Sequence, residues 1–341
     1  MLTVKLGKTG IVSPKNAFGA LPVQRVSEEY AAMLLRKAYE AGIRFFDTAR
    51  AYSDSERKVG LALGDVRENV YIATKTGSFT VEGFWRDLNM SLATLGTDYI
   101  DIYQFHNPPF CPKLGDGTGL YEAMLEAKAQ GKIRHIGITN HRLSIAREAV
   151  ESGLYETLQF PFSYLCSEKD VALVRLCEEQ DVGFIAMKGL SGGLITDSSA
   201  AYAYIAQFSN VLPIWGVQHM WELEEFLAFF REPAVMTDAM RRQIECDRTA
   251  LGGDFCRGCG YCMPCPVGIK INDCARMSQM IRRAPKGPQL SEASRESMER
   301  ITQCIGCGAC KSRCPYGLDV PELLKRNLAD YRRIVNGEIV V

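Results

Sequence analysis

Eight cysteines of this 341-residue chain lie in two short runs with the spacing of metal-cluster ligands. Each run begins with three cysteines spaced three residues apart and ends on a Cys-Pro pair: Cys256, Cys259, Cys262 and Cys265 in the first run, and Cys304, Cys307, Cys310 and Cys314 in the second. The second run has the C-x2-C-x2-C-x3-C-P spacing of 4Fe-4S cluster ligands, and the first is one residue shorter before its last cysteine. Because each cubane takes four thiolates, the sequence predicts two 4Fe-4S clusters.

In two-cluster ferredoxins the fourth cysteine of each run binds the other cluster. We therefore expect one cluster on Cys256, Cys259, Cys262 and Cys314, and the other on Cys304, Cys307, Cys310 and Cys265. Zinc is the main alternative for paired CxxC motifs, and two runs of four followed by proline argue against it. Crowding of this kind is also unlike a disulfide framework. We expect the remaining cysteines to act as small apolar side chains: Cys111, Cys166, Cys177, Cys246 and Cys274.

A second set of chemically active side chains comprises Asp47, Tyr52, Lys75 and His106. Hydride addition to a carbonyl leaves an alkoxide, so a proton donor must meet the oxygen, and Tyr52 is the candidate general acid. The ordinary pKa of a tyrosine, ~10, is high for this task. A nearby Lys75 ammonium would favour the phenolate, and Asp47 would neutralise and position Lys75. His106 would hydrogen-bond to the carbonyl oxygen and orient it.

The part of the chain that carries these four residues alternates β-rich runs with amphipathic segments. The helix expected at 27–41 begins with a Ser27 cap, has its apolar stripe at Met33, Leu34 and Ala38, and stops at Gly42. Eight strand–helix units describe a (β/α)8 TIM barrel, whose active sites lie on the rim at the carboxyl ends of the strands. The expected strands are Asn16–Leu21, Arg44–Asp47, Val70–Lys75, Tyr99–His106, Ile133–Thr139, Thr157–Phe162, Gly183–Lys188 and Val211–Gly216.

The sequence predicts a barrel domain over residues 1–236 and a small, mainly helical ferredoxin-like domain over residues 237–341. A hairpin with its turn at 7–10 is expected before the first strand. The stretch 237–253 is polar and Arg-rich and forms the junction. In the second domain we expect helices at 271–283, 291–302 and 321–336, with a Pro/Gly hinge at 285–288.

The segments Phe45–Ala49 with Tyr52, Ile72–Lys75 and Tyr103–His106 resemble the catalytic motifs of aldo/keto reductases. The resemblance extends over the whole barrel part and implies carbonyl reduction with NADPH or NADH. Thr139, Asn140 and Gln159 match positions that hold the nicotinamide amide in that family, and Phe162–Tyr164, including Tyr164, could stack on the ring. Lys188, Gly189 and Leu190 through Gly193 offer a flexible backbone and one cation suited to a pyrophosphate, although Gly192 and Gly193 fit an ordinary Gly-rich loop equally well. For the adenosine phosphate, the family pattern points to the loop that begins at Gly216.

The loop after the last expected strand departs from the family pattern. From Gly216 to Phe226 it has three acidic residues, and no Lys or Arg precedes Arg231. A cation for the 2′-phosphate of NADP is therefore missing, which leaves NADP, NAD and a flavin such as FMN as alternatives. We expect the loop 107–119, rich in Pro and Gly, to set substrate specificity.

Clusters transfer single electrons, whereas a nicotinamide transfers a hydride. Three alternatives follow: a flavin links the two, a partner such as ferredoxin or flavodoxin does, or the clusters are structural. The main alternative to a carbonyl reductase is an electron-transfer protein whose barrel binds a flavin or a partner and does not reduce carbonyls.

The charge of the chain is balanced, with 40 Lys+Arg against 40 Asp+Glu. This balance indicates neither a nucleic-acid surface nor a membrane surface and favours a small-molecule partner. We expect no secretory signal and no transmembrane segment, and a cytoplasmic location in which thiolates stay reduced. His135, His141 and His219 have no partner pattern and receive no role.

Overall fold

The computed structural model describes residues 2–251, 255–283 and 286–340, and for residue 286 only the backbone. The chain forms two compact units. The first consists of Met1–Gly189 and Ser199–Thr237, and the second of Leu190–Ser198 and Asp238–Val341. The sequence placed the boundary at 236/237 and did not anticipate that the segment Leu190–Ser198 groups with the second unit. Among the described residues, no helix has both the length and the apolar character that crossing a lipid bilayer requires.

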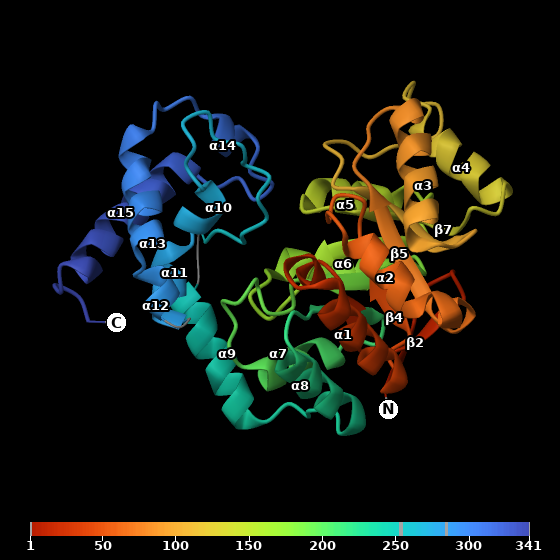
Figure 1. Cartoon of the computed structure of the whole chain (residues 1–341), viewed down its shortest axis with the longest axis horizontal. Helices are drawn as coiled ribbons and strands as arrows, with labels where there is room; N and C mark the ends of the chain where they lie inside the picture. Colours follow the sequence, from red (N-terminus) through yellow and green to blue (C-terminus); the bar gives the residue numbers. More distant parts are fainter. Residues whose placement is uncertain (1, 252–254, 284–285, 341) are drawn as a thin grey trace. The chain divides into compact units, whose positions relative to one another are not determined.

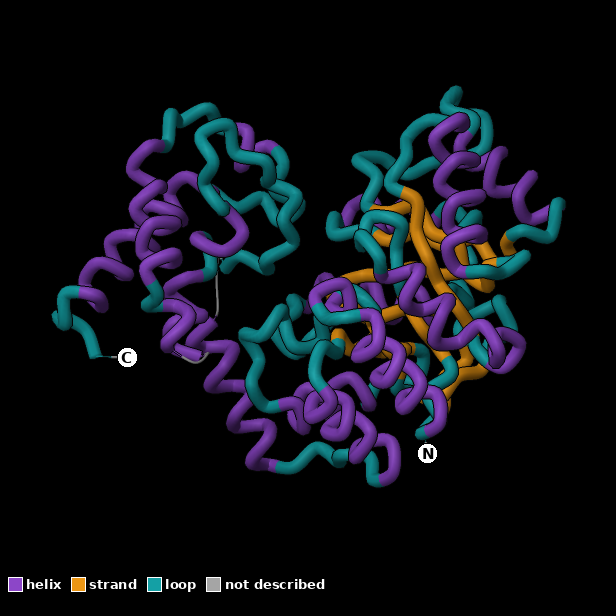
Figure 2. Tube along the Cα trace, viewed as in Figure 1, coloured by secondary structure: helices purple, strands orange, loops and turns teal. Residues whose placement is uncertain are grey.

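The first unit is a closed barrel of eight parallel strands, in the order β10-β3-β4-β5-β6-β7-β8-β9. Figures 1 and 2 show the strands surrounded by helices. The predicted (β/α)8 barrel is therefore confirmed. Its strands are β3 (Ala17–Gly19), β4 (Phe45–Asp47), β5 (Tyr71–Thr76), β6 (Ile100–His106), β7 (Ile133–Thr139), β8 (Thr157–Pro161), β9 (Gly183–Met187) and β10 (Val211–Gly216).

The barrel helices are short and amphipathic. In α1, Ser27 accepts a hydrogen bond from the backbone N–H of Tyr30, which caps the helix start as expected. Leu34 and Ala38 of α1 are buried, whereas Met33, expected on the same stripe, is 50% exposed. The helices of this part are α1 (Glu28–Glu40), α2 (Ser55–Leu63), α3 (Val81–Leu95), α4 (Leu120–Ala129), α5 (Leu143–Glu151), α6 (Glu168–Glu179), α7 (Ser198–Ala206) and α8 (Met220–Arg231).

The predicted hairpin before the barrel is present. Strands β1 (Thr3–Lys5) and β2 (Val12–Pro14) pair antiparallel. Val4, Leu6 and Ile11 are buried in one cluster with Phe45 of β4 and Ile185 of β9. The hairpin thus contributes to the apolar core of the barrel, since burial of these side chains is favourable.

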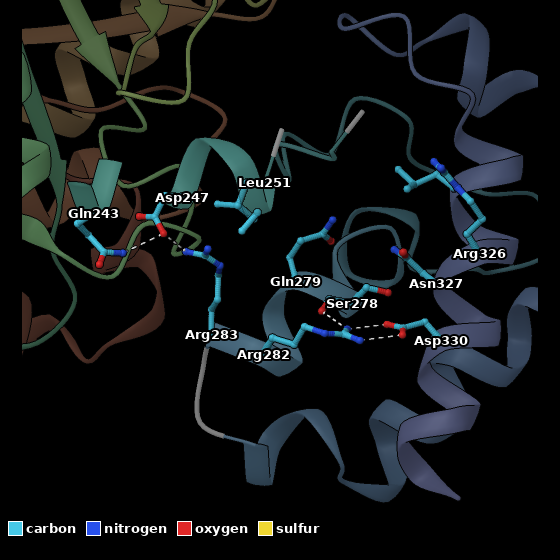
Figure 3. A pocket seen from close by; sticks show the side chains of 12 residues that line it. Gln243, Asp247, Leu251, Ser278, Gln279, Arg282, Arg283, Arg326, Asn327 and Asp330 are labelled. Atoms are coloured by element: carbon cyan, nitrogen blue, oxygen red, sulfur yellow. Dashed lines mark hydrogen bonds and ion pairs between the residues drawn. The ribbon is translucent and has the colours of Figure 1, made fainter. Parts of the chain in front are cut away.

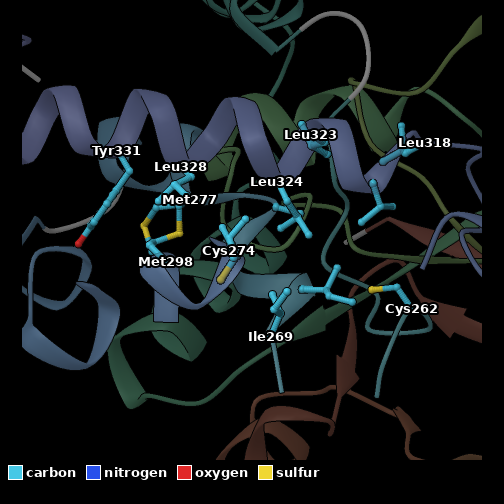
Figure 4. Packing of buried hydrophobic residues seen from close by; sticks show 14 of the residues in the cluster. Cys262, Ile269, Cys274, Met277, Met298, Leu318, Leu323, Leu324, Leu328 and Tyr331 are labelled. Atoms are coloured by element: carbon cyan, nitrogen blue, oxygen red, sulfur yellow. The ribbon is translucent and has the colours of Figure 1, made fainter. Parts of the chain in front are cut away.

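The second unit is helical and is built around one apolar cluster. Figure 4 shows α15 (Val320–Val335) packed over Cys274, Met277 and Met298. The helix expected at 271–283 is two helices, α10 (Ile271–Cys274) and α11 (Met277–Arg283). A hinge was expected at 285–288, but its described residues belong to the short helix α12 (Lys286–Gln289). Proline is tolerated in the first turn of a helix. The remaining helices are α9 (Asp238–Leu251), α13 (Glu292–Glu299), η3 (Arg300–Gln303) and α14 (Ala309–Ser312).

Helices α9, α11 and α15 surround a cavity of about 790 Å³ (Figure 3). Two ion pairs connect its walls. Arg282 donates to both carboxylate oxygens of Asp330 at 2.6 and 2.8 Å, and Arg283 donates to Asp247 at 2.9 Å. These pairs join α11 to α15 and α9 by geometrically specific, charge-assisted hydrogen bonds.

Candidate functional site

Lys75 and Asp47 form a buried ion pair at the carboxyl ends of two neighbouring strands. The Lys75 ammonium donates to Oδ1 and Oδ2 of Asp47 at 2.8 and 2.7 Å, and to the carbonyl oxygen of Thr48 at 2.6 Å. Lys75 is 0% exposed and Asp47 is 2% exposed. Burial lowers the pKa of Lys75 and the carboxylate of Asp47 opposes this; burial likewise raises the pKa of Asp47.

Tyr52 lies close to both Lys75 and His106. The Lys75 Nζ is 5.3 Å from the centre of the Tyr52 ring. The Tyr52 and His106 rings meet edge to face with centroids 5.7 Å apart. Both side chains keep partial exposure, whereas the ion pair behind them is buried. The structure therefore brings the four predicted catalytic side chains together.

The imidazole of His106 is held neutral. Burial, followed by the nearby Lys75 ammonium, lowers the pKa of His106 to about 3. A neutral imidazole can donate one hydrogen bond to an oxygen without losing a proton near neutral pH. This is the form that a residue orienting a carbonyl group needs.

The loop that carries Tyr52 is fixed by hydrogen bonds on both sides. The N–H of Tyr52 donates to the carbonyl oxygen of Ala49 at 3.0 Å. At the start of α2, the Ser55 hydroxyl donates to the carbonyl oxygen of Ala20 at 2.7 Å and lies 2.9 Å from the Thr48 hydroxyl. Tyr52 is thus held in position by β3, β4 and α2 together.

Glu56 supports the site and was not predicted from the sequence. Its carboxylate is fully buried, forms an ion pair with Arg50, and accepts hydrogen bonds from Thr74 and Ser91 at 2.6 and 2.7 Å. It also favours the charged form of Lys75. Its position four residues after Tyr52 is the only signal in the sequence, and a glutamate in a first helical turn ordinarily indicates a helix start.

The residues expected at the nicotinamide amide belong to a buried network behind the ion pair. Gln159 accepts a hydrogen bond from Gln104 at 2.9 Å and donates to Asp47 at 3.4 Å, and the Thr139 hydroxyl donates to Gln104 at 3.0 Å. Gln104 links these groups and had no role in the sequence-based prediction. The nicotinamide contacts of Thr139 and Gln159 stay a prediction.

Asn140 and Tyr164 are engaged elsewhere in the barrel. The Asn140 amide donates to the carbonyl oxygen of Pro108 at 2.9 Å, and its oxygen accepts from the N–H of Arg142 at 2.8 Å. It therefore helps to hold the expected specificity loop. Tyr164 is fully buried and meets the ring of Tyr204 edge to face.

The expected phosphate-binding positions have unusual backbone geometry. Lys188 has a φ of 59°, a left-handed conformation that is uncommon outside glycine. A Cβ on Gly189 would lie 2.4 Å from Trp215, so only glycine fits there. Leu190 begins the segment that belongs to the second unit. Gly216 ends β10 and pairs in register with Gly19.

At the start of α8 the Glu222 carboxylate caps the backbone that leads into the helix. Glu222 accepts hydrogen bonds from the N–H groups of Gln218 and His219 at 2.7 and 2.8 Å. These two N–H groups precede Met220, the first residue of α8, and the contact to His219 belongs to a capping box. The loop also lacks a Lys or Arg for a 2′-phosphate.

The eight run cysteines line two small cavities of the second unit. One is lined by Cys256, Cys259, Cys262 and Cys314 with Ile271 and Leu318 among its apolar walls. The other is lined by Cys265, Cys304, Cys307 and Cys310, and Cys262 also reaches it. Each cavity thus combines three cysteines of one run with the last cysteine of the other. This grouping is the one expected for two cubanes.

The electrostatics of the thiols agree with this grouping. Burial, then the neighbouring Cys256, Cys259 and Cys314, raises the pKa of Cys262 to about 12. The backbone N–H of Gly258 donates to the Cys256 sulfur at 3.4 Å, a contact that stabilises a thiolate. The donor set therefore fits 4Fe-4S clusters.

Among the five other cysteines, Cys111, Cys177 and Cys274 are buried as expected. Cys246 lies on the polar helix α9 and is exposed, so it is not part of an apolar cluster. Of the histidines without a role, His135 lies 2.7 Å from Glu156 in a local pair.

The family model of the aldo/keto reductases matches residues 15–210, which is more than half of the chain. The chain belongs to the aldo/keto reductase family. A model of the 4Fe-4S dicluster domain also matches this aldo/keto reductase, at residues 255–319. That range covers all eight run cysteines.

Curated relatives resemble parts of this aldo/keto reductase. An aldo-keto reductase of Mycobacterium avium is 36% identical over 137 residues, covering 38% of this chain and 46% of the relative. L-galactose dehydrogenase of Arabidopsis thaliana is 30% identical over 211 residues, covering 56% and 66%. The chain therefore spans about half to two thirds of the length of these relatives.

Solved structures share the fold of the barrel. An aldo-keto reductase from Klebsiella pneumoniae in complex with NADPH superposes with a TM-score of 0.62 at 20% identity. The match covers 72% of this chain and 94% of that structure. At this identity the likeness shows the fold alone.

Proposed function

We propose that this protein is an oxidoreductase that reduces the carbonyl group of a small molecule with NADPH or NADH, and that its clusters exchange single electrons. One observation carries the proposal: the partly exposed Tyr52 ring lies near both the buried Lys75 ammonium and the His106 ring. A phenol in this setting can deliver a proton to the oxygen of a carbonyl as hydride reaches the carbon.

Each rim residue has a distinct task in this proposal. Tyr52 donates the proton from its hydroxyl group. Lys75 favours the resulting phenolate by its charge, and Asp47 holds Lys75 in place through two hydrogen bonds. Neutral His106 donates a hydrogen bond to the substrate oxygen and orients it. Substrate choice is assigned to the loop 107–119, because rim loops set specificity in this fold.

A nicotinamide cofactor supplies the hydride when it is bound. Support for such a cofactor comes from the structural neighbour in complex with NADPH. Lys188 and Gly189 provide a cation and a backbone without a side chain for the pyrophosphate. The Glu222 carboxylate at the start of α8 disfavours a 2′-phosphate there, so we propose that NADH is accepted together with NADPH.

The cluster-binding unit gives the protein a second, single-electron route. We propose a ferredoxin or flavodoxin as electron partner, and a flavin such as FMN as the group that would link single-electron and hydride transfer. Thiolate ligands require a reducing environment, which supports a cytoplasmic location.

Two measurements test this proposal. The protein is purified anaerobically and its iron, sulfide and flavin contents are determined. The oxidation of NADH and NADPH is then followed with a panel of aldehydes and ketones. We expect iron in both clusters and turnover with at least one carbonyl compound. Cofactor oxidation that never depends on a carbonyl, together with rapid cluster reduction by ferredoxin, would instead establish an electron-transfer protein.

A further inference from the structure

The first two cysteines of each run lie in equivalent loops, and the surroundings of the two loops differ. Gly258 lies between Cys256 and Cys259, and Gly306 lies between Cys304 and Cys307. Both glycines are left-handed, with φ of 63° and 66°. A Cβ on Gly258 would lie 2.3 Å from Nη1 of Arg276, whereas a Cβ on Gly306 would meet no atom of the described chain within 4 Å. A guanidinium group thus packs against the first loop.

Arg276 is a cation without a carboxylate partner among the described residues. It lies in the short break between α10 and α11, half-buried, and its Nε is buried without a hydrogen-bond partner. Its Nη2 donates to the carbonyl oxygen of Gly192 and contacts the Met280 sulfur at 3.2 Å. The charges of Cys256 and Asp273 both favour its protonated form. Within the described part of the chain, Asp273 forms no ion pair with it. A guanidinium remains protonated in such a place, so a positive charge lies beside the first cluster site.

A fixed positive charge acts on the redox equilibrium of a cluster. A 4Fe-4S cluster with its four thiolates is an anion, and uptake of one electron adds one negative charge. A nearby cation stabilises the reduced form more than the oxidised form, and the effect is strong where water is scarce. Cys304 and Cys307 are exposed, so water can screen the charge of the second cluster, whereas Cys262, a ligand of the first cluster, is buried.

We propose that Arg276 is a positioning residue that compensates the charge of the cluster on Cys256, Cys259, Cys262 and Cys314 and connects its redox state to the segment Leu190–Ser198. The proposal rests on the cluster assignment of the proposed function and is independent of carbonyl reduction.

The connection to the segment runs through one hydrogen bond. Arg276 holds the Gly192 carbonyl, and Gly192 and Gly193 have left-handed φ values of 68° and 90°. Nη1 of Arg283 donates a hydrogen bond to the carbonyl oxygen of Leu194, in the same segment, at 3.1 Å. Reduction of the cluster increases its attraction for Arg276, which changes the hydrogen bond to Gly192. In the chain this segment follows directly on Lys188 and Gly189, the expected pyrophosphate positions.

Redox titration of the full, anaerobically purified protein, followed by EPR, tests the charge compensation. In Arg276→Gln we expect one of the two one-electron equilibria to shift about tenfold toward the oxidised form, which corresponds to about 59 mV. The other should stay unchanged, and Arg276→Lys, which keeps the positive charge, should retain most of the wild-type potential. A variant with Cys265→Ala and Cys304→Ala identifies which potential belongs to the first cluster. Unchanged potentials in Arg276→Gln, or equal shifts in the Gln and Lys variants, would overturn the proposal.

A matched pair of glycine variants controls for backbone strain. Gly258→Ala displaces the Arg276 guanidinium, whereas Gly306→Ala has the same positive φ and no neighbour to displace. We expect Gly258→Ala to shift the potential of the first cluster in the direction of Arg276→Gln, with iron content as the check on cluster retention. Equal shifts in the two glycine variants would contradict a role for Arg276.

Hydrogen–deuterium exchange tests the connection to the segment without any substrate or cofactor. We expect the amides of 190–198 to exchange at different rates in the oxidised and the dithionite-reduced protein, and at equal rates in Arg276→Gln. Equal exchange in both states of the wild type would refute the connection. A protein that fails to reduce any carbonyl but shows these shifts would disprove the proposed function and leave this inference intact.

Discussion

Gln159 on β8 donates a hydrogen bond to Oδ2 of Asp47 on β4, across 3.4 Å of the barrel interior. The same carboxylate oxygen accepts from Lys75 at 2.7 Å. Asp47 is therefore held from two sides, and its buried charge is compensated by a cation and an amide. The position of Lys75 next to Tyr52 follows from this arrangement, and so do the first two predictions.

Tyr52→Phe removes the proposed proton donor and little else. We expect kcat for carbonyl reduction to fall by a factor of about 10²–10⁴, the usual size of general acid catalysis, with unchanged affinity for NADPH. Steady-state NADPH oxidation and cofactor fluorescence titration measure the two quantities. Tyr39→Phe, on α1, is the matched control and should leave both unchanged. Full turnover in Tyr52→Phe would contradict the assignment.

Asp47→Ala leaves the Lys75 ammonium buried without its partner. Breaking a buried ion pair on one side typically costs about 3–5 kcal/mol, and we expect the barrel to lose stability by this order. Chemical denaturation, with the unfolding of the barrel followed by tryptophan fluorescence, measures the loss. Asp65→Ala, at the exposed pair with Arg36, is the control and should change little. Similar losses in both variants would argue against a strongly coupled buried pair.

His106 should make stability depend on pH below neutrality. Its pKa is about 3 in the folded protein and ~6.5 in an unfolded chain, so the unfolded chain binds one more proton between these values. The stabilising contribution is complete above pH ~6.5 and is lost as the pH falls toward 3, by at most about 1.4 kcal/mol per pH unit. We expect wild type to lose more stability than His106→Asn between neutral pH and mildly acidic pH. Parallel denaturation curves for the two proteins would show that His106 is not held neutral.

The crossed cysteine grouping can be tested by iron content. The double variant Cys256→Ala with Cys314→Ala should disrupt one cluster and keep roughly half of the iron, because both residues line one cavity. Cys256→Ala with Cys265→Ala should disrupt both clusters. If each run bound its own cluster, the two results would be exchanged. Iron and acid-labile sulfide assays after anaerobic purification decide between them.

The strands and their rim residues were predictable because periodicity and strand ends are local properties of a sequence. Asp47, Lys75 and His106 each close a β-rich run, and parallel strands bring such ends to one rim. The cysteine grouping was predictable because ligand number and spacing constrain it.

Contacts between distant segments could not be predicted in the same way. Gln104 meets Gln159, and Glu56 meets Ser91, only when the barrel closes. Asn140 was expected to contact a cofactor, which stays a prediction, and the structure adds that its amide donates a hydrogen bond to the carbonyl oxygen of Pro108. A polar side chain at a strand end shows the same pattern in a sequence whether it contacts a ligand or a neighbouring loop.

The segment Leu190–Ser198 has consequences for protein engineering. Both of its ends continue into the first unit, so the chain passes between the two units at 189/190, 198/199 and 237/238. Truncation at Thr237 would remove Arg276 and Arg283 and leave this strip of backbone without its hydrogen-bond donors. We therefore expect that the barrel cannot be isolated by deleting the second unit, and that a minimal version would need a redesigned connection between β9 and α7.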